Sequence, residues 1–335
     1  MKMHKIMFTM TMLMGTLMTI SAYSWLTMWM GLEINLISII PIMMQKKNLF
    51  SSEASMKYFI TQAMASTVLL AAVILLLMEN EFIYPQMNLP LNLMMNSALL
   101  TKAGAAPFHF WLPEVIEGLS WMNALILLTW QKIAPMIMLM TNLISNYLLT
   151  ASIVISLLTS TIGAFNQVSL RKIMALSSIN HMAWMMATMM ISLSTWTAYF
   201  LVYSVINLNI MLTFKATKTF YTSQMSNFSN KNKMTKIALM MNFMSLGGLP
   251  PFIGFMPKWL VINWATKNSL IMLILIMVVT TLIMLFVYIR MMLPSLVMAT
   301  TEPKLNSEIS DSWMYAMNTL NISSLLLCTL ISNSY

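Results

Sequence analysis

The chain has 335 residues, of which 59% are hydrophobic and 8% are charged, with a net charge of +9. Soluble domains carry about 25% charged residues, so this composition excludes a water-soluble domain and predicts a polytopic membrane protein. One cysteine and three histidines are too few for a disulfide framework, a cysteine metal site or a haem bundle. The positive residues gather in the loops between apolar runs. This pattern indicates the charge signal that orients membrane proteins, and not a nucleic-acid partner.

Methionine accounts for 42 of the 335 residues. It packs like a flexible leucine, and packing alone does not require so many. An AT-rich gene read with the animal mitochondrial code, in which an isoleucine codon specifies methionine, would produce this excess. The first apolar run also begins directly after Lys5, without a signal or transit peptide. Both observations favour synthesis inside the mitochondrion and a place in its inner membrane.

A helix needs about 20 residues to cross the hydrocarbon layer, and the chain contains about eleven apolar runs of that order. We therefore predict an all-α protein with about eleven transmembrane helices. In chain order the predicted spans are Met7–Ala22, Trp25–Met44, Ala54–Met78, Leu91–Phe110, Trp121–Met140, Leu148–Phe165, Ile173–Leu193, Thr195–Phe214, Ile237–Trp264, Leu270–Leu293 and Trp313–Ser332.

This order of helices divides the positive residues unequally between the two sides of the membrane. Lys267 lies on the far side, and Lys102, Lys132 and Lys258 lie within the membrane. The side that carries the N-terminus receives all the others: Lys2, Lys5, Lys46, Lys47, Lys57, Arg171, Lys172, Lys215, Lys218, Lys231, Lys233, Lys236, Arg290 and Lys304. By the positive-inside rule we expect the N-terminus in the matrix and the C-terminus in the intermembrane space.

The fourth and ninth predicted helices share the pattern G-x-x-P-F-x-x-x-x-P, which begins at Gly104 and again 144 residues later at Gly248. Pro107 in the first copy, and Pro250 and Pro251 in the second, remove backbone donors, so we expect both helices to break there. Unwound backbone is tolerated at membrane depth where it is buried in protein or lines a wet cavity.

Each broken helix is the fourth of five, which predicts two five-helix repeats, residues 1–140 and 141–293. Because five is odd, the second repeat enters the membrane from the opposite side, so the two repeats are inverted. Broken helices at matching positions of inverted repeats indicate a transport path. A loop and one extra helix, residues 294–335, complete the chain. The alternative is two coincidental proline kinks.

Four charged residues lie inside predicted helices: Glu33, Lys102, Lys132 and Lys258. A charge at the bilayer centre costs about 2.5–3.5 kcal/mol, so four unpaired charges would cost on the order of 10 kcal/mol. We expect them to face the interior and to form a proton path. Loss of hydration favours an uncharged lysine, whereas a nearby carboxylate favours the charged form. Movement of Glu33 towards or away from a lysine would therefore make that lysine hold or release its proton. The alternative is static salt bridges between helices.

His109 lies in the first break and His181 in the seventh predicted helix, and either is a candidate proton relay near neutral pH. A hydrogen-bonded packing role is an equal alternative for His181. Glu114 and Glu117 follow the first break. We expect them to be solvated or to cap the next helix, and a role in proton entry is the less favoured alternative. The sequence contains no pattern for a redox, metal or nucleotide site.

Several motifs resemble the antiporter-like subunits of mitochondrial NADH:ubiquinone oxidoreductase, respiratory complex I. They occupy residues 29–35, 102–111, 120–124, 130–135 and 247–259. The resemblance implies that Glu33 and Lys102 form the family's glutamate–lysine pair, Lys132 is the central lysine and Lys258 the terminal proton-releasing residue. It also implies that the chain lacks the first three of the family's fourteen helices.

The same resemblance implies that the chain binds no cofactor, because NADH, FMN, iron–sulfur clusters and ubiquinone belong to other parts of the complex. The expected partners are other membrane-arm subunits, including a neighbouring antiporter-like subunit and small core subunits, and phospholipids, with cardiolipin as a candidate. Two alternatives stay open: a free-standing cation/proton antiporter, and a structural subunit whose charges are inert.

Overall fold

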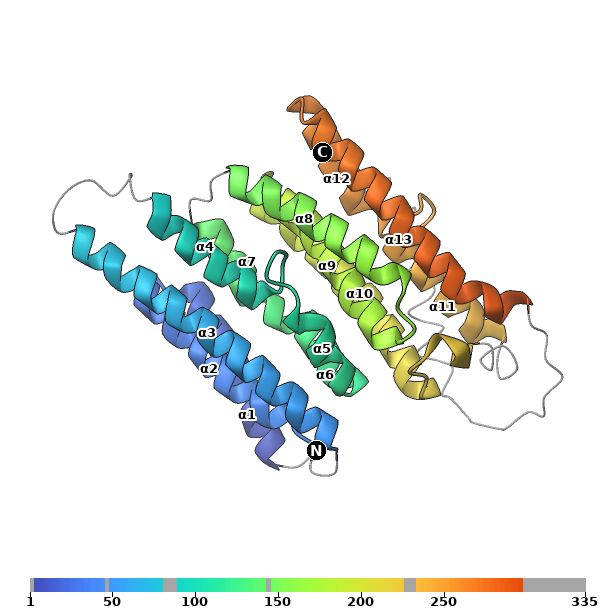
Figure 1. Ribbon diagram of the computed structural model, residues 1–335, viewed down its shortest axis with the longest axis horizontal. Helices are drawn as coiled ribbons and strands as arrows, with labels where there is room; N and C mark the ends of the chain where they lie inside the picture. The colour runs from blue at the N-terminus through green and yellow to red at the C-terminus, as the bar shows by residue number, and fades with distance from the viewer. Residues whose placement is uncertain (1–2, 46–47, 81–88, 143–145, 226–232, 298–335) are drawn as a thin grey trace. The chain divides into compact units, whose positions relative to one another are not determined.

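The computed structural model describes residues 3–45, 48–80, 89–142, 146–225 and 233–297, and these residues form helices without a β-strand. The chain divides into two compact units, Met1–Ser152 and Ile153–Tyr335. In the first unit the helices are α1 (Met3–Ser21), α2 (Trp25–Met43), α3 (Leu49–Asn80), α4 (Leu89–Ala103), α5 (Trp111–Gly118), α6 (Trp121–Leu128) and α7 (Trp130–Thr141) (Figure 1).

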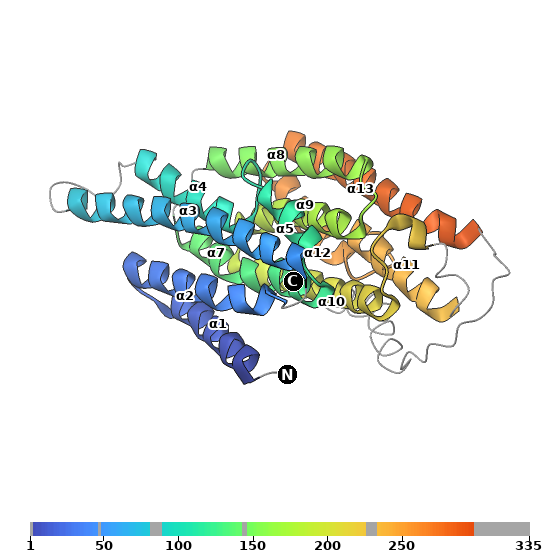
Figure 2. The same ribbon diagram turned by 60° about the horizontal axis from the view of Figure 1, so that its bottom comes forward.

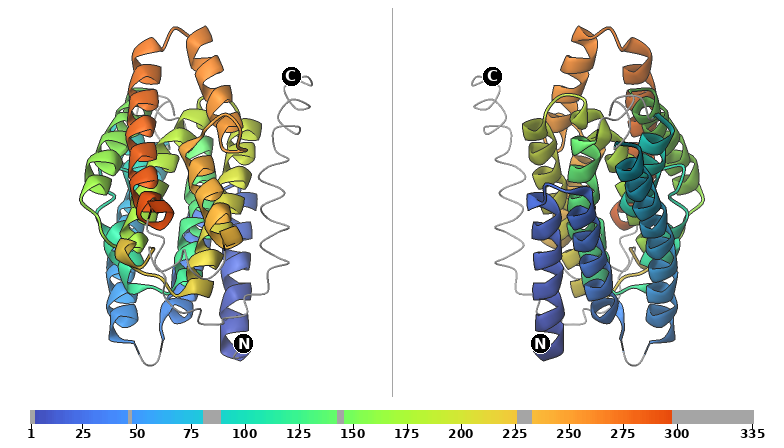
Figure 3. Two further views of the ribbon diagram at one scale, coloured as in Figure 1. Left: turned by 90° about the vertical axis from the view of Figure 1, so that its right-hand side faces the viewer. Right: turned by 90° about the vertical axis from the view of Figure 1, so that its left-hand side faces the viewer.

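Helix α8 (Asn146–Phe165) crosses the boundary between the units. The second unit continues with α9 (Leu170–Met189), α10 (Leu193–Thr217), α11 (Lys233–Gly247), α12 (Phe255–Lys267) and α13 (Ile271–Val297). Helix α9 contacts α10, α12 and α13, and every residue from Ile173 to Thr188 is buried. A helix that is buried on all sides can carry polar residues away from lipid. Figure 3 shows the short connection between α12 and α13.

Six described helical segments are long and apolar enough to cross a membrane. These segments are Trp25–Met43, Leu49–Met78, Trp121–Thr141, Tyr147–Phe165, Leu193–Thr217 and Ile271–Leu293, and each overlaps one of the predicted spans. The first and seventh predicted spans are also helical, in α1 and α9. The predicted last span, Trp313–Ser332, lies outside the described residues. The all-helical membrane fold is therefore confirmed, while the count of eleven stays a prediction.

The two predicted helix breaks are present, and in both the first helix ends at a glycine with positive φ. Helix α4 ends at Ala103 and α5 begins at Trp111, whereas α11 ends at Gly247 and α12 begins at Phe255. Gly104 (φ +75°) and Gly248 (φ +82°) occupy the left-handed region that glycine adopts without strain.

Each of these glycines closes its helix with the same pair of hydrogen bonds. The Gly104 N–H donates to the Thr101 carbonyl, and the next N–H donates to the carbonyl of Leu100. In the second break the Gly248 N–H donates to Ser245, and the next N–H donates to Met244. This is the Schellman ending of a helix, so the repeated sequence pattern specifies a repeated stop signal.

One interruption was not predicted. The fifth predicted helix, Trp121–Met140, is divided into α6 and α7 at Thr129 (φ −112°, ψ −72°). Pro135 lies inside α7, where it cannot donate a backbone hydrogen bond to the preceding turn. At the interruption, the backbone N–H and the hydroxyl of Thr129 both donate to the Leu125 carbonyl, at 3.0 and 2.8 Å. The irregularity immediately precedes Lys132.

Glycines bring α1 and α2 into close contact (Figure 2). A Cβ atom added to Gly31 would lie 2.6 Å from Thr19 Cγ2 and 2.9 Å from the Gly15 carbonyl oxygen. A Cβ atom on Gly15 would lie 3.0 Å from the Asn35 backbone nitrogen. Small residues allow helix backbones to approach closely in membranes, where lipid supplies no hydrophobic force between helices.

We expect Gly31→Ala to destabilise the protein by about 1–3 kcal/mol, because the new methyl group meets fixed backbone of α1. The measurement is thermal unfolding of the detergent-solubilised protein. Gly163→Ala is the matched control, because its Cβ atom meets a movable Leu176 side chain at 3.2 Å. Equal stability of the two variants would contradict the close packing of α1 and α2.

Candidate functional site

The first predicted charge pair forms within unit 1. Lys102, in the last turn of α4, places its Nζ atom 4.0 Å from Oε1 of Glu33 on α2. The side chains are 3% and 24% exposed, respectively, and Glu33 Oε1 has no hydrogen-bond partner among the described residues. The prediction that these residues lie within ion-pairing reach is confirmed. The separation is long for a direct hydrogen bond, so small movements will change the interaction strongly.

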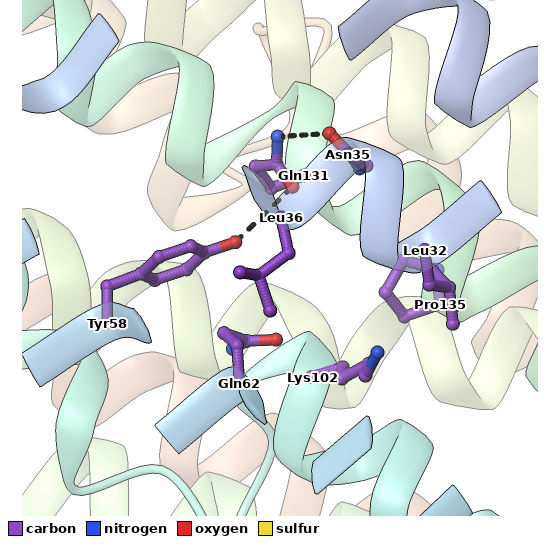
Figure 4. Close-up of a pocket in the computed structure, with 8 residues that line it drawn as sticks. All are labelled: Leu32, Asn35, Leu36, Tyr58, Gln62, Lys102, Gln131 and Pro135. Atoms are coloured by element: carbon purple, nitrogen blue, oxygen red, sulfur yellow. Dashed lines mark hydrogen bonds between the residues drawn. The ribbon is translucent and has the colours of Figure 1, made fainter. Parts of the chain in front are cut away.

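A small polar cavity adjoins Lys102 (Figure 4). It has about 10 Å³ of space for the centre of a water-sized sphere, which is room for about one water molecule. Its lining residues are Leu32, Asn35, Leu36, Tyr58, Gln62, Lys102, Gln131 and Pro135. The lining therefore joins α2, α3, α4 and α7 around one buried amine.

The polar wall of this cavity is a hydrogen-bonded chain across three helices. The Tyr58 hydroxyl lies 3.4 Å from Gln131 Oε1, and Gln131 Nε2 donates to Asn35 Oδ1 at 2.9 Å (Figure 4). Gln62 Nε2 is buried without a hydrogen-bond partner among the described residues. A buried amide donor without a partner is costly, so this group favours a water molecule in the cavity.

Lys132 follows Gln131 on α7 and is 2% exposed. Its backbone N–H donates to the Thr129 carbonyl at the interruption between α6 and α7. The polar wall thus extends from the residue beside Lys132 to the cavity beside Lys102. Both lysines are buried inside unit 1.

Lys258 lies in unit 2 and is held differently. Its Nζ atom donates to the carbonyl oxygens of Leu246 (3.0 Å) and Gly247 (2.9 Å), at the end of α11. It also lies 5.6 Å from the ring centroid of Trp184 on α9. The last carbonyls of a helix carry partial negative charge, so the break itself supplies the partner of this lysine.

The two histidines have different surroundings. His109 lies between α4 and α5, where it is 7% exposed, and its Nδ1 atom has no hydrogen-bond partner among the described residues. Its ring centroid lies 4.4 Å from that of Phe110. His181 on α9 is also 7% exposed, and its Nδ1 atom lies 2.9 Å from the hydroxyl of Tyr199 on α10. His181 is therefore hydrogen-bonded, while the choice between relay and packing remains open.

Glu114, on the first turn of α5, is largely exposed and forms a 3.1 Å ion pair with Lys57 on α3. Lys57 also pairs with Glu53 one turn earlier at 3.1 Å. Exposed pairs of this kind contribute little to stability. The geometry agrees with the solvated alternative for Glu114. Within the described residues, no three histidine, cysteine, aspartate or glutamate side chains could hold a metal ion.

Sequence reasoning missed two groups of site residues. The first is the polar wall of Asn35, Tyr58, Gln62 and Gln131, and the second is Tyr199, whose hydroxyl is hydrogen-bonded to His181. The available signal was the presence of uncharged polar residues within otherwise apolar spans. Uncharged polar residues inside a transmembrane helix, like charged ones, indicate a functional site or a hydrogen bond to a neighbouring helix.

Comparison with known proteins places these residues in a family. The family model described as "NADH:quinone oxidoreductase/Mrp antiporter, TM" matches residues 22–284. The chain belongs to this family. Its relatives include NADH-ubiquinone oxidoreductase chain 2 of Anopheles gambiae, 50% identical over 85% of this chain and 83% of that protein. The protein of the same name from Aedes aegypti is 46% identical over 95% and 94% of the two chains.

Solved structures with the same fold are found at much lower sequence identity. A chain of respiratory complex I from Thermus thermophilus has a TM-score of 0.84 at 20% identity, covering 97% of this chain and 78% of that one. A chain of the Mrp complex from Dietzia sp. DQ12-45-1b has a TM-score of 0.83 at 15% identity, covering 97% and 75%. Within the family, the motifs of this chain most resemble subunit 2 of the animal mitochondrial enzyme, and the names of its relatives confirm that resemblance.

Gly248 determines where the Lys258 side chain can lie. A Cβ atom at position 248 would lie 2.8 Å from Lys258 Cδ and 2.9 Å from its Nζ. We therefore expect Gly248→Ala to move the amine away from the carbonyls of Leu246 and Gly247. The left-handed backbone adds about 1–2 kcal/mol of strain.

The measurement is a structure of the variant at side-chain resolution, together with its thermal stability. Gly247→Ala is the control, because its Cβ atom would meet a movable Leu285 side chain at 3.1 Å. The expectation is wrong if Lys258 Nζ still bonds both carbonyls in the Gly248→Ala protein.

Proposed function

We propose that this chain is the proton-translocating membrane subunit of an NADH:ubiquinone oxidoreductase, respiratory complex I, in the mitochondrial inner membrane. The observation that carries the proposal is the buried Lys102 amine, 4.0 Å from the single carboxylate of Glu33. A buried ion pair between two membrane helices is expensive and contributes little net stability, which favours a functional role. Membership of the family supplies the reaction class.

The chain acts as part of an enzyme and carries no redox centre of its own in this proposal. NADH, FMN, iron–sulfur clusters and ubiquinone bind elsewhere in the complex. The partners are other membrane-arm subunits, including a neighbouring antiporter-like subunit and small core subunits, with phospholipids such as cardiolipin at the lipid-facing surface. Two inverted five-helix repeats, residues 1–140 and 141–293, and a helix within 294–335 complete the proposed architecture of eleven spans.

The proposed path begins at Glu33 and Lys102 and continues to Lys132 and then Lys258. Movement of Glu33 towards Lys102 stabilises the charged amine, and movement away lets it release a proton. The cavity beside Lys102 also reaches α7, the helix that carries Lys132, at Gln131 and Pro135. Each lysine must alternate between charged and neutral forms.

A free-standing cation/proton antiporter is the second candidate, because the family includes Mrp antiporters and the fold is shared with a chain of an Mrp complex. The names of the closely similar relatives favour the complex I subunit. Reconstitution without redox subunits distinguishes the two, since an antiporter would exchange Na⁺ or K⁺ for protons by itself.

Lys132→Met is expected to lower the number of protons pumped per electron while the complex still assembles. Methionine keeps the length of the side chain and removes the proton carrier. Lys132→Arg is expected to fail as well, because arginine keeps its proton throughout the accessible pH range. The measurement is proton uptake per NADH oxidised by the complex in sealed vesicles, with assembly quantified separately.

Normal pumping by the Lys132→Arg complex would show that position 132 needs a fixed positive charge and not a carrier. Normal pumping by both variants would remove Lys132 from the path altogether. The Lys57→Met variant is the matched control, because Lys57 is an exposed lysine outside the proposed path.

The proposed orientation has the Lys215–Lys236 segment in the matrix and Tyr335 in the intermembrane space, because the positive residues gather on the first side. We expect protease added to mitoplasts to leave the Lys215–Lys236 segment intact and to cleave it only after the inner membrane is opened. Lys267 is the internal comparison, since it lies on the opposite side. Cleavage of the basic segment from outside would overturn the orientation.

A further inference from the structure

Three buried tyrosines surround the polar face of α9, and the path proposed above uses none of them. Tyr199 and Tyr203 on α10 are 1% and 2% exposed, and Tyr288 on α13 is 2% exposed. Tyr199 and Tyr203 are four residues apart, so they share the face of α10 that contacts α9 (Figure 1). A phenol buried this deeply requires a hydrogen-bond partner.

Tyr199 and Tyr203 both lie close to His181, with ring centroids 6.1 and 5.0 Å from the imidazole. The Tyr199 hydroxyl lies 2.9 Å from Nδ1 of His181. This hydrogen bond joins α10 to the ionisable side chain of α9.

This contact determines where His181 carries its proton when it is neutral. In the described part of the chain, His181 Nδ1 is the hydrogen-bond partner recorded for the Tyr199 hydroxyl. A buried O–H without an acceptor is costly, so the hydroxyl donates to Nδ1 and the ring proton lies on Nε2. The Tyr199 oxygen is therefore placed to pass a proton to Nδ1.

The pair also lies close to the terminal lysine of the proposed path. Trp184 is three residues after His181 on α9, so the two side chains share one face of the helix. Lys258 Nζ lies 5.6 Å from the Trp184 ring centroid. The described residues of unit 2 contain no aspartate or glutamate, so a neutral hydroxyl takes the place that a carboxylate usually has beside a catalytic histidine.

We propose that the Tyr199 hydroxyl relays protons to His181, an inference that rests on the proton-translocating function proposed above. An arriving proton binds the phenol oxygen while the existing O–H bond breaks and its proton passes to Nδ1. Tyr199 remains a neutral phenol, and His181 becomes an imidazolium that releases the proton on Nε2. Rotation of the hydroxyl and the imidazole restores the first arrangement. No tyrosinate forms.

The test compares Tyr199→Phe with Tyr203→Phe in the assembled complex. Both variants remove one buried hydroxyl from α10, and both rings lie near His181, with ring centroids 6.1 and 5.0 Å away in the native protein. The loss of a hydrogen bond worth about 1 kcal/mol predicts about a fivefold fall in coupled turnover for Tyr199→Phe. Tyr203→Phe is expected to keep turnover within about twofold.

The second readout is the solvent deuterium isotope effect on turnover, with every rate expressed per assembled complex. It should increase in Tyr199→Phe, because proton transfer becomes slower than the other steps, and a packing defect alone would not increase it. An unchanged isotope effect, or equal losses in the two Phe variants, would overturn the proposal. So would normal turnover of Tyr199→Phe.

The Lys132 variants separate this inference from the proposed function. If Lys132→Met abolishes pumping while Tyr199→Phe behaves as the native complex, the function stands and the Tyr199 relay is wrong. If Lys132→Met pumps normally, the proposed path itself fails. His181→Gln must reproduce the loss seen in Tyr199→Phe, and normal turnover of that variant also overturns the relay.

Discussion

The structure depends on one constraint: inside lipid, each charge and each freed backbone group must find its partner within the protein. The two helix breaks meet this constraint with side chains from the helix that follows. In the first break the indole N–H of Trp111 donates to the Thr101 carbonyl at 3.1 Å. In the second break the Lys258 amine bonds the carbonyls of Leu246 and Gly247. The free carbonyls at the helix end are thus hydrogen-bonded by a neutral indole, that of Trp111, in one unit, and by the charged amine of Lys258 in the other.

Helix α2, which carries Glu33, is fixed at both ends by contacts with backbone atoms. Gly31 packs against α1, and Trp29 donates its indole N–H to the Ser66 carbonyl at 3.1 Å. At the other end, Asn123 Nδ2 donates to the carbonyls of Ile42 and Met43. A helix held in this way resists displacement as a body, so the variable part of the charge pair is the Glu33 side chain.

The sequence was sufficient for the helices, the two breaks and the charged residues, because each has a strong local signal. Length and apolarity predict a span, a glycine followed by prolines predicts a stop, and a lysine in an apolar run must be buried. The interruption at Thr129 was missed because a threonine in an apolar run lowers helix propensity only slightly and is no signal for a break. The bond between Tyr199 and His181 was missed because a buried tyrosine in an apolar helix resembles ordinary packing, and its partner lies 18 residues away.

Lys102 and Lys258 illustrate two ways to hold a buried amine, with different consequences for proton transfer. The partner of Lys102 is a flexible carboxylate at 4.0 Å, so the interaction changes whenever Glu33 moves. The partners of Lys258 are backbone carbonyls at 3.0 and 2.9 Å, whose position is fixed by the end of α11. Movement of a neighbouring side chain cannot remove those carbonyls. Release of a proton from Lys258 therefore requires either displacement of the amine itself or the arrival of another positive charge nearby. His181 shares a face of α9 with Trp184, whose ring lies 5.6 Å from the Lys258 amine, so a protonated His181 is the candidate for that charge.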